Sequence, residues 1–156
     1  MRKRKPKKRA ILPDVKYKEV LVAKFINRMM MHGKKMLATS IFYDALEIVK
    51  NKVEGVAEIE TFKKALENVT PLVEVRTRRI GGANFPIPQP VRDERKLTLA
   101  IRWMVSAARK RSEKSFAERL AAEIILAAKL EGAAVKMRTD AHRMAEANKA
   151  FSHFRF

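Results

Sequence analysis

The side chains of this sequence with the clearest potential for binding are positively charged residues next to flexible, glycine-containing backbone. Arg76, Arg78 and Arg79 precede Gly81-Gly82 in the stretch RTRRIGGANFPIPQP, residues 76–90. Glycine lets a backbone approach a phosphate closely, and the arginines put positive charge at the same place. We interpret the stretch as a basic turn that contacts nucleic acid. An ordinary surface hairpin whose arginines keep it soluble is the alternative.

Two further groups of cations fit the same chemistry. Lys34 and Lys35 follow Gly33 at the expected start of a helix, where cations are disfavoured unless an external phosphate binds. A helix expected over residues 92–111 has one apolar and one basic side, and Arg102 has no acid four residues away to pair with. A tolerated lysine pair and a solvated helix face are the respective alternatives.

The N-terminus adds a basic arm. Residues 1–9 carry seven basic side chains without hydrophobic periodicity, so we expect residues 1–14 to be flexible until a partner binds. The full set of cations expected to bind RNA is Arg2, Lys3, Arg4, Lys5, Lys7, Lys8, Arg9, Lys34, Lys35, Arg76, Arg78, Arg79, Arg92, Arg95, Arg102, Arg109 and Lys110.

The overall charge favours a polyanionic partner. Lys and Arg number 35 against 17 Asp and Glu, which leaves a net charge of +18. Binding phosphates offsets this self-repulsion and releases condensed counterions, so nucleic acid leads over an anionic membrane. No export signal or membrane-spanning stretch is recognisable, and the lack of cysteine suits the cytoplasm.

Catalytic and metal chemistry find no support in the residue types. Cysteine is absent, His32, His142 and His153 lack metal-ligand spacing, and no Ser/His/Asp set is recognisable. We therefore expect no enzyme activity, no cofactor and no metal site.

The first elements that must position the cations are helices of a single domain over residues 15–150. Apolar residues at three- and four-residue spacing predict a helix from Val15 to Gly33. A second helix has a wide apolar arc, and we expect it to be central. A third ends before Thr70-Pro71, because proline disfavours helix at the preceding residue.

Three more helices follow the glycine-rich stretch. The helix over residues 92–111 is followed by one that opens with a capping box formed by Ser115 and Glu118. A sixth is expected to begin near Thr139. The fold class is therefore mainly α, with six helices.

Between these two groups, residues 72–91 predict a two-stranded antiparallel β-ribbon. Apolar and charged residues alternate from Val73 to Arg79, and after the glycines prolines stand at positions 86, 88 and 90. All three missing N–H donors fall on one edge, so the sheet stops at two strands. Such a ribbon is marginal alone and must lie against a helix or a partner.

The C-terminal tail, residues 151–156, interleaves aromatic and basic side chains. It could stack on unpaired bases, or Phe151 and Phe154 could pack back onto the domain. The sequence leaves both possibilities open.

Three long motifs resemble a known family. MHGKK at 31–35, ENVTPLVEVRTRRIGGANF at 67–85 and HRMAEANKAFSHFRF at 142–156 are similar to the bacterial seventh protein of the small ribosomal subunit. The resemblance implies a six-helix domain with a protruding β-ribbon. It also implies that the protein binds the 3′ major domain of 16S rRNA directly and nucleates assembly of the 30S head.

The same resemblance implies a place at the subunit interface near the decoding centre. Its expected partners are 16S rRNA, exit-site tRNA, small-subunit proteins nine and eleven, and mRNA as a further candidate; no membrane contact or homo-oligomer is expected. The residues expected near exit-site tRNA are Gly81, Gly82, Ala83, Asn84, Lys136 and Arg143. The sequence departs from the family at Pro86 and Pro90, where the family generally has polar residues.

Two other functions remain open from the residues alone. A DNA-compacting protein would share the charge but would need dimer symmetry and a duplex-spaced surface. An RNA-processing enzyme would need clustered acids, histidines or a metal.

Overall fold

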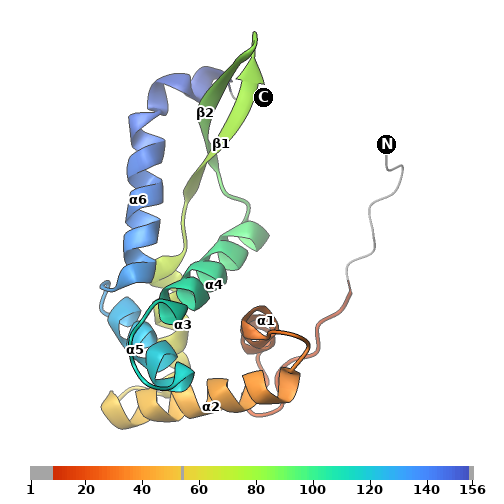
Figure 1. The fold of residues 1–156 in the computed structure, drawn as a ribbon, viewed down its shortest axis with the longest axis vertical. Coiled ribbons are helices and arrows are strands. Elements are labelled where there is room, and N and C mark those ends of the chain that lie inside the picture. The colour runs from red at the N-terminus through yellow and green to blue at the C-terminus, as the bar shows by residue number, and fades with distance from the viewer. Residues whose placement is uncertain (1–8, 54, 155–156) are drawn as a thin grey trace.

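The computed structural model describes residues 9–53 and 55–154, so the predicted arm cations Arg2, Lys3, Arg4, Lys5, Lys7 and Lys8 lie outside this part of the chain. Within it the fold is mainly helical with one two-stranded sheet, as predicted (Figure 1). None of these helices is long and apolar enough to cross a membrane. The elements are α1 (Val20–Met29), α2 (Lys35–Lys52), α3 (Glu58–Val69), β1 (Val73–Ile80), β2 (Ala83–Pro90), α4 (Asp93–Arg109), α5 (Phe116–Ala128), α6 (Ala133–Ala147) and the 3-10 helix η1 (Lys149–Phe154).

Helices α1 to α5 form a body around a core of aromatic rings. Phe25 of α1, Phe42 of α2 and Phe62 of α3 are fully buried, and their ring centroids lie 5.1 to 5.3 Å apart. These separations suit tilted and edge-on contacts, which stabilise aromatic pairs beyond the effect of burial alone. Met104 of α4 and Ile124 of α5 complete the core. The body is therefore a packed frame for the surface cations.

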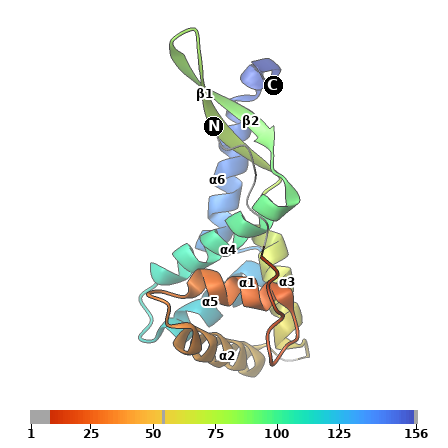
Figure 2. The same cartoon turned by 90° about the vertical axis from the view of Figure 1, so that its right-hand side faces the viewer.

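The β-ribbon and α6 extend from this body together (Figures 1 and 2). α6 packs along β1 and η1 packs against β2, which confirms that the ribbon lies against a helix. The strands pair from Val73 with Pro90 to Ile80 with Ala83, and the turn between them is Gly81-Gly82. These glycines have φ values of 57° and 92°, the two positive values that a tight type I′ hairpin turn requires.

The prolines of β2 do not disturb the pairing of the strands. Because Ile80 and Ala83 close the turn as a hydrogen-bonded pair, hydrogen-bonded and non-hydrogen-bonded pairs alternate along the ribbon. The prolines face positions 77, 75 and 73 of β1, which are non-hydrogen-bonded sites. A bond of 3.0 Å from Val91 N to Leu72 O continues the alternation. The predicted proline edge is confirmed, and the described sheet has two strands.

Three predictions about helix ends are confirmed, for α3, α4 and α5. α3 ends at Val69, directly before Thr70-Pro71, and α4 lies within residues 92–111. The capping box of α5 is formed, because Ser115 Oγ accepts from Glu118 N at 3.2 Å and Glu118 Oε2 accepts from Ser115 N at 3.4 Å. Local sequence is sufficient at these places, because the residues that end or cap each helix are its immediate neighbours.

The helix predicted from Val15 to Gly33 was too long at both ends, since α1 spans only Val20–Met29. Asp14 explains the late start. Its Oδ2 accepts hydrogen bonds from the backbone N–H groups of Lys16 and Tyr17, both at 3.1 Å, and this holds the segment in a turn.

The prediction that α6 begins near Thr139 was also wrong, because a buried carboxylate caps the helix six residues earlier. Glu123 of α5 is fully buried, and its Oε1 accepts from Ala134 N at 2.8 Å. Its Oε2 accepts from Arg111 Nη1 at 3.1 Å. A negative group on the N–H donors of a helix start satisfies them and suits the helix dipole. The cap comes from another helix, so the residues around the start of α6 do not reveal it.

The prediction that α2 is central was wrong as well. α2 lies along one end of the body (Figure 1), and Met36 and Leu37 in its first turn are 84% and 55% exposed. Its later turns are buried, with Phe42 and Leu46 fully inside the core. The wide apolar arc of α2 therefore contains two surfaces. One packs in the core, and the other is not covered by any described part of the protein.

Candidate nucleic-acid interface

Three arginines from two helices converge on one surface hollow. Arg28 near the end of α1 and Arg102 and Arg109 of α4 line a depression of about 360 Å³, together with Met30 and Met31. All three arginines are exposed, and among the described residues no ion pair neutralises them. Three unpaired guanidinium groups around one hollow are suited to bind phosphate oxygens. We call this depression the basic hollow.

Arg109 also holds the two helices of the basic hollow together. Its Nη2 donates a hydrogen bond to the backbone carbonyl of Met29 at 3.2 Å. That carbonyl belongs to the last turn of α1, where it has no acceptor role within the helix and the dipole favours a cation. Arg109 is therefore fixed in position, and its remaining N–H donors can point toward a ligand.

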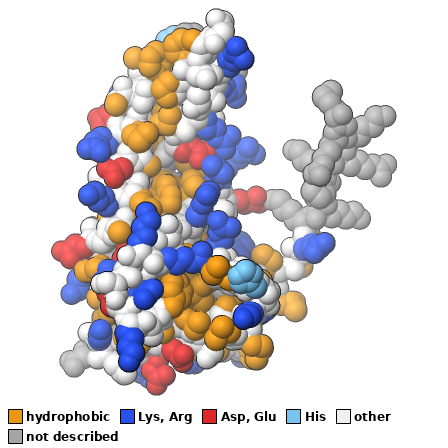
Figure 3. Space-filling model, in the orientation of Figure 1, with side chains coloured by type: hydrophobic (Ala, Val, Ile, Leu, Met, Phe, Trp, Pro, Cys, Tyr) orange, Lys and Arg blue, Asp and Glu red, His pale blue; other side chains and the backbone are white. Residues whose placement is uncertain are grey.

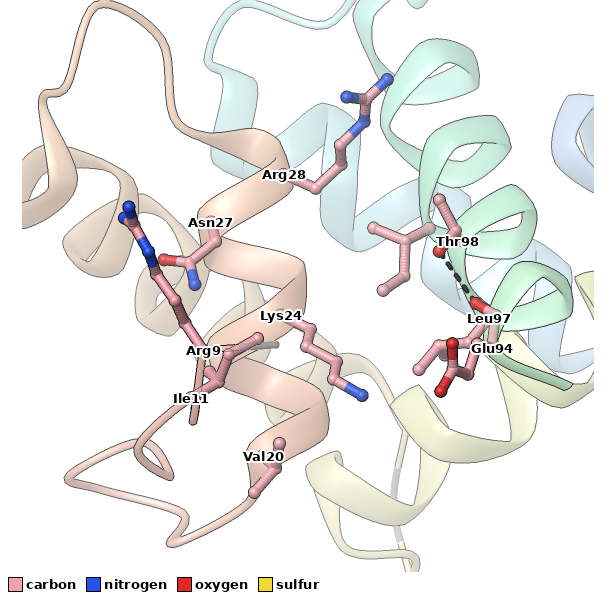
Figure 4. A pocket seen from close by; sticks show the side chains of 10 residues that line it. Arg9, Ile11, Val20, Lys24, Asn27, Arg28, Glu94, Leu97 and Thr98 are labelled. Carbon is pink, nitrogen blue, oxygen red and sulfur yellow. Dashed lines mark hydrogen bonds between the residues drawn. The ribbon is translucent and has the colours of Figure 1, made fainter. Parts of the chain in front are cut away.

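A larger hollow continues the interface toward the N-terminal arm. It measures about 740 Å³ and lies between α1 and α4, with Arg9, Lys24 and Arg28 among its lining residues (Figure 4). Lys24 projects from α1 toward α4, where Thr98 donates to the carbonyl of Glu94 at 2.9 Å. Arg28 lines both hollows, so the cations of α1 form a continuous row beside α4.

Lys34 and Lys35 occupy the predicted place at the start of α2. Lys34 is the N-cap residue, Lys35 is the first helical residue, and both are exposed. The first turn of α2 contains no acidic residue that would compensate them. Such a helix start offers both free N–H donors and side-chain cations to an anion.

The base of the ribbon is tied to α4 by an ion-pair network that the sequence did not suggest. Glu74 Oε1 accepts from Arg76 Nε at 2.7 Å, and both oxygens of Glu74 accept from Arg95 Nε at 2.8 Å. Burial raises the pKa of Glu74, but the hydrogen bonds from Arg95 and Arg76 outweigh this effect and keep the pKa below its ordinary value. Arg76 and Arg95 were predicted to bind RNA. In the structure both pair with Glu74, and the pair with Arg95 ties the ribbon to α4.

The ribbon tip is exposed and basic. Arg78 and Arg79 lie on β1 just before the turn, and residues 81–84 form the turn and the start of β2. Arg92 at the start of α4 and Lys110 at its end are also exposed. Lys and Arg side chains follow the ribbon and gather over α4 on the same face (Figure 3). Exposed cations thus lie along both the ribbon and α4 on this face.

The two α6 residues expected near tRNA lie at different heights. Lys136 is in the part of α6 next to the body, whereas Arg143 is farther toward the ribbon tip (Figure 1). Both are exposed, and Arg143 pairs with Asp140 at 3.0 Å. The ribbon tip is at the opposite end of α6 from Lys136, so one ligand that reaches both must span the length of α6.

His142 links α6 to the foot of the ribbon, and no metal group surrounds it. Its Nε2 accepts from Leu72 N at 3.0 Å, so this nitrogen must be unprotonated. Burial and then the charge of Arg138 lower the pKa of His142 below its ordinary value. The described residues contain no cluster of three or more His, Cys, Asp or Glu that could hold a metal ion.

Of the two possibilities for the tail, packing on the domain holds for Phe151. Its ring centroid is 5.5 Å from that of Phe85 in β2, in a tilted arrangement. The side chain of Phe154 and residues 155–156 lie outside the described part of the chain.

Lys24 and Arg28 were not among the residues predicted to bind RNA, although they line the two hollows. Their spacing of four residues was visible, and both fall on the polar side of α1. The cations on α4 were recognised by the same criterion, so the signal was present for α1 too. The convergence of α1 and α4 was not visible in the sequence.

Comparison with known proteins identifies the family. A family model described as Ribosomal protein S7p/S5e matches residues 1–149. The chain is 56% identical over 156 residues to small ribosomal subunit protein uS7 of Cytophaga hutchinsonii, and 58% identical over 158 residues to that of Christiangramia forsetii, with 100% of each chain covered. It is 54% identical over 155 residues to the uS7 protein of Francisella tularensis, with 99% of each chain covered. The chain therefore belongs to the ribosomal protein S7p/S5e family.

Proposed function

We propose that this ribosomal protein is a structural component of the small subunit that binds the 3′ major domain of 16S rRNA directly and nucleates assembly of the 30S head. Its family consists of ribosomal proteins and not of enzymes, and as a small-subunit protein this chain is located with the ribosome in the cytoplasm. The observation that carries the proposal beyond family membership is the convergence of Arg28, Arg102 and Arg109 on one hollow. A generic polycation needs no such arrangement.

The mechanism is electrostatic and geometric. The packed body holds three basic surfaces at fixed places, namely the α1–α4 hollows, the start of α2 and the ribbon. Each surface binds phosphates and releases counterions, which stabilises the complex. Because the surfaces are joined by a rigid frame, binding also fixes RNA segments relative to one another. Ordering the RNA of the head is thus the activity of the protein.

The ribbon supports a position of the protein at the subunit interface, near the decoding centre. Its exposed tip, with Gly81, Gly82, Ala83 and Asn84, extends away from the body (Figure 1). Such a projection can reach exit-site tRNA and mRNA while the body remains on rRNA. Small-subunit proteins nine and eleven are the proposed protein neighbours.

Hydroxyl-radical footprinting on total small-subunit rRNA tests the proposal. We expect discrete protections confined to the 3′ major domain at near-stoichiometric protein, and the same protections in the presence of excess duplex DNA. Protections spread over all rRNA domains, or lost to the DNA competitor, would show generic polyanion binding instead. A stable dimer in RNA-free solution would favour the DNA-compacting alternative.

A further inference from the structure

An apolar hollow adjoins the basic hollow. It measures about 320 Å³ and lies where the α1–α2 turn, the first turns of α2 and the start of α5 meet. Leu37, Ile41 and Phe116 are part of its lining. Met30, Met31 and Arg109 line both hollows. The apolar and basic hollows are therefore neighbouring compartments of one surface.

The apolar hollow leaves large side chains open to water. Met31 and Leu37 are each 55% exposed, and both line it. Single exposed apolar residues need no explanation, but several around one concavity indicate a binding site. Figure 3 shows hydrophobic side chains lying among Lys and Arg side chains on this face of the body. A ligand with an apolar part and a negatively charged group beside it would complement this surface.

Charge and size together favour a nucleotide over a protein helix. His32, Lys34 and Arg109 surround the apolar hollow, and the basic hollow lies next to it. About 320 Å³ is near the lower limit of small-molecule pockets. An amphipathic helix needs a longer groove, because its anchor residues extend over two turns or more. A flat base attached to phosphates fits both the apolar surface and the surrounding cations.

We infer that the apolar hollow takes one unpaired nucleobase of the bound RNA, while the basic hollow holds the phosphates beside that base. Single-stranded RNA is commonly recognised this way, with splayed bases on apolar or aromatic side chains and the backbone on cations. Arg109 stands between the two compartments, fixed by its bond to the Met29 carbonyl. The inference rests on the proposed function, since it assigns a base site within the same RNA interface.

Two neighbouring residues provide a matched pair of variants. Leu37 lines the hollow, whereas Met36, the preceding residue, does not, and it is 84% exposed. Leu37→Glu and Met36→Glu each add one negative charge in the first turn of α2, where acids are compatible with the helix dipole. The two variants therefore differ mainly in whether the carboxylate enters the apolar hollow. Leu37→Ala is a third variant, which removes apolar contact without adding charge.

Binding to a transcript of the 3′ major domain is measured at several salt concentrations. Base contacts of this kind contribute roughly tenfold or more to affinity, so Leu37→Glu should bind about tenfold more weakly than Met36→Glu. The salt slopes of the two variants should agree, because both keep the same phosphate contacts. Leu37→Ala should weaken binding about threefold relative to wild type. Circular dichroism and thermal unfolding confirm that each variant is folded.

Chemical probing separates the inference from the proposed function. Wild type and Met36→Glu should protect one more base edge from dimethyl sulfate or carbodiimide than Leu37→Glu, with unchanged backbone footprints. Equal base protections and equal affinities for all variants would overturn the inference while the footprint of the 3′ major domain still supported the function. If wild type gives no footprint there, the function itself fails. Unchanged RNA binding by Leu37→Glu with a lost protein contact in the assembling head would make the hollow a protein site and also refute the inference.

Discussion

Removing two arginines of the basic hollow should change the salt dependence of RNA binding by a predictable amount. Arg28→Ala with Arg102→Ala takes one cation from each wall of the hollow. Arg109 is left in place, because its bond to the Met29 carbonyl supports α1 and its loss would also affect folding. The double variant therefore tests phosphate binding without disturbing the contact between α1 and α4.

The magnitude follows from counterion release. Each lost phosphate contact lowers the slope of log K against log salt by about 0.7 to 0.9, so two contacts lower it by roughly 1.4 to 1.8. If the affinities converge near 1 M salt, the variant should bind about 25- to 60-fold more weakly at 0.1 M. Filter binding or anisotropy with a transcript of the 3′ major domain, at five or more salt concentrations, measures both quantities.

The matched control removes the same charge elsewhere. Lys50→Ala with Lys52→Ala changes two exposed lysines in the last turn of α2, at the end remote from α1 (Figure 1). Only the nonspecific effect of a lower net charge should remain in this variant. The reasoning is refuted if the control loses as much slope as the arginine variant. It is also refuted if the arginine variant loses affinity with no change of slope.

Three further predictions concern the frame that carries the interface. Glu123→Ala should cost about 1 to 3 kcal/mol in the free energy of unfolding by urea, because the buried N–H of Ala134 loses its acceptor at the start of α6, whereas Arg111 keeps Glu113 as an ion-pair partner; a loss no larger than that of an exposed-site control would contradict this. The pKa of His142 is lowered from 6.5, so the stability from its neutral ring should be fully present above that pH and lost as pH falls through the folded pKa. The difference in unfolding free energy between wild type and His142→Ala, measured from pH 5 to 8, should become smaller as the pH falls. A difference that does not change with pH would show that the hydrogen bond from Leu72 N to His142 is not the source of the stabilisation. Ser115→Ala should cost roughly 1 kcal/mol and lower the melting temperature, and no change would mean that the capping box is unimportant.

Much of the fold could be predicted because its signals are local. The ends of α3 and α4, the capping box at Ser115 and the proline edge of β2 each depend on residues close together in the chain. The predicted starts of two helices were wrong, in one case because the capping residue is distant in the chain and in the other because a local turn signal was misread. The cap of α6 is a carboxylate from α5, and the late start of α1 depends on the turn around Asp14.

The candidate site shows the same division. Lys34, Lys35 and the arginines of α4 were predicted from charge and helical periodicity, and they are exposed where expected. Their participation in RNA binding stays a prediction. Lys24 and Arg28 were missed because their meaning depends on α1 lying beside α4. Arg95 has a second role that periodicity could not reveal, since its partner Glu74 is on the ribbon.

The sequence by itself determined the surplus of positive charge, the six helices, the glycine turn and the edge on which the ribbon cannot grow. These follow from composition, from side-chain spacing along a single element and from the missing N–H of proline. Tertiary structure alone decided which cations meet in one hollow, which of them form ion pairs with acidic side chains, and which apolar residues of α2 stay outside the core. The physical reason is that a side chain's environment is set by whichever element packs beside it, and packing joins residues that the chain keeps far apart.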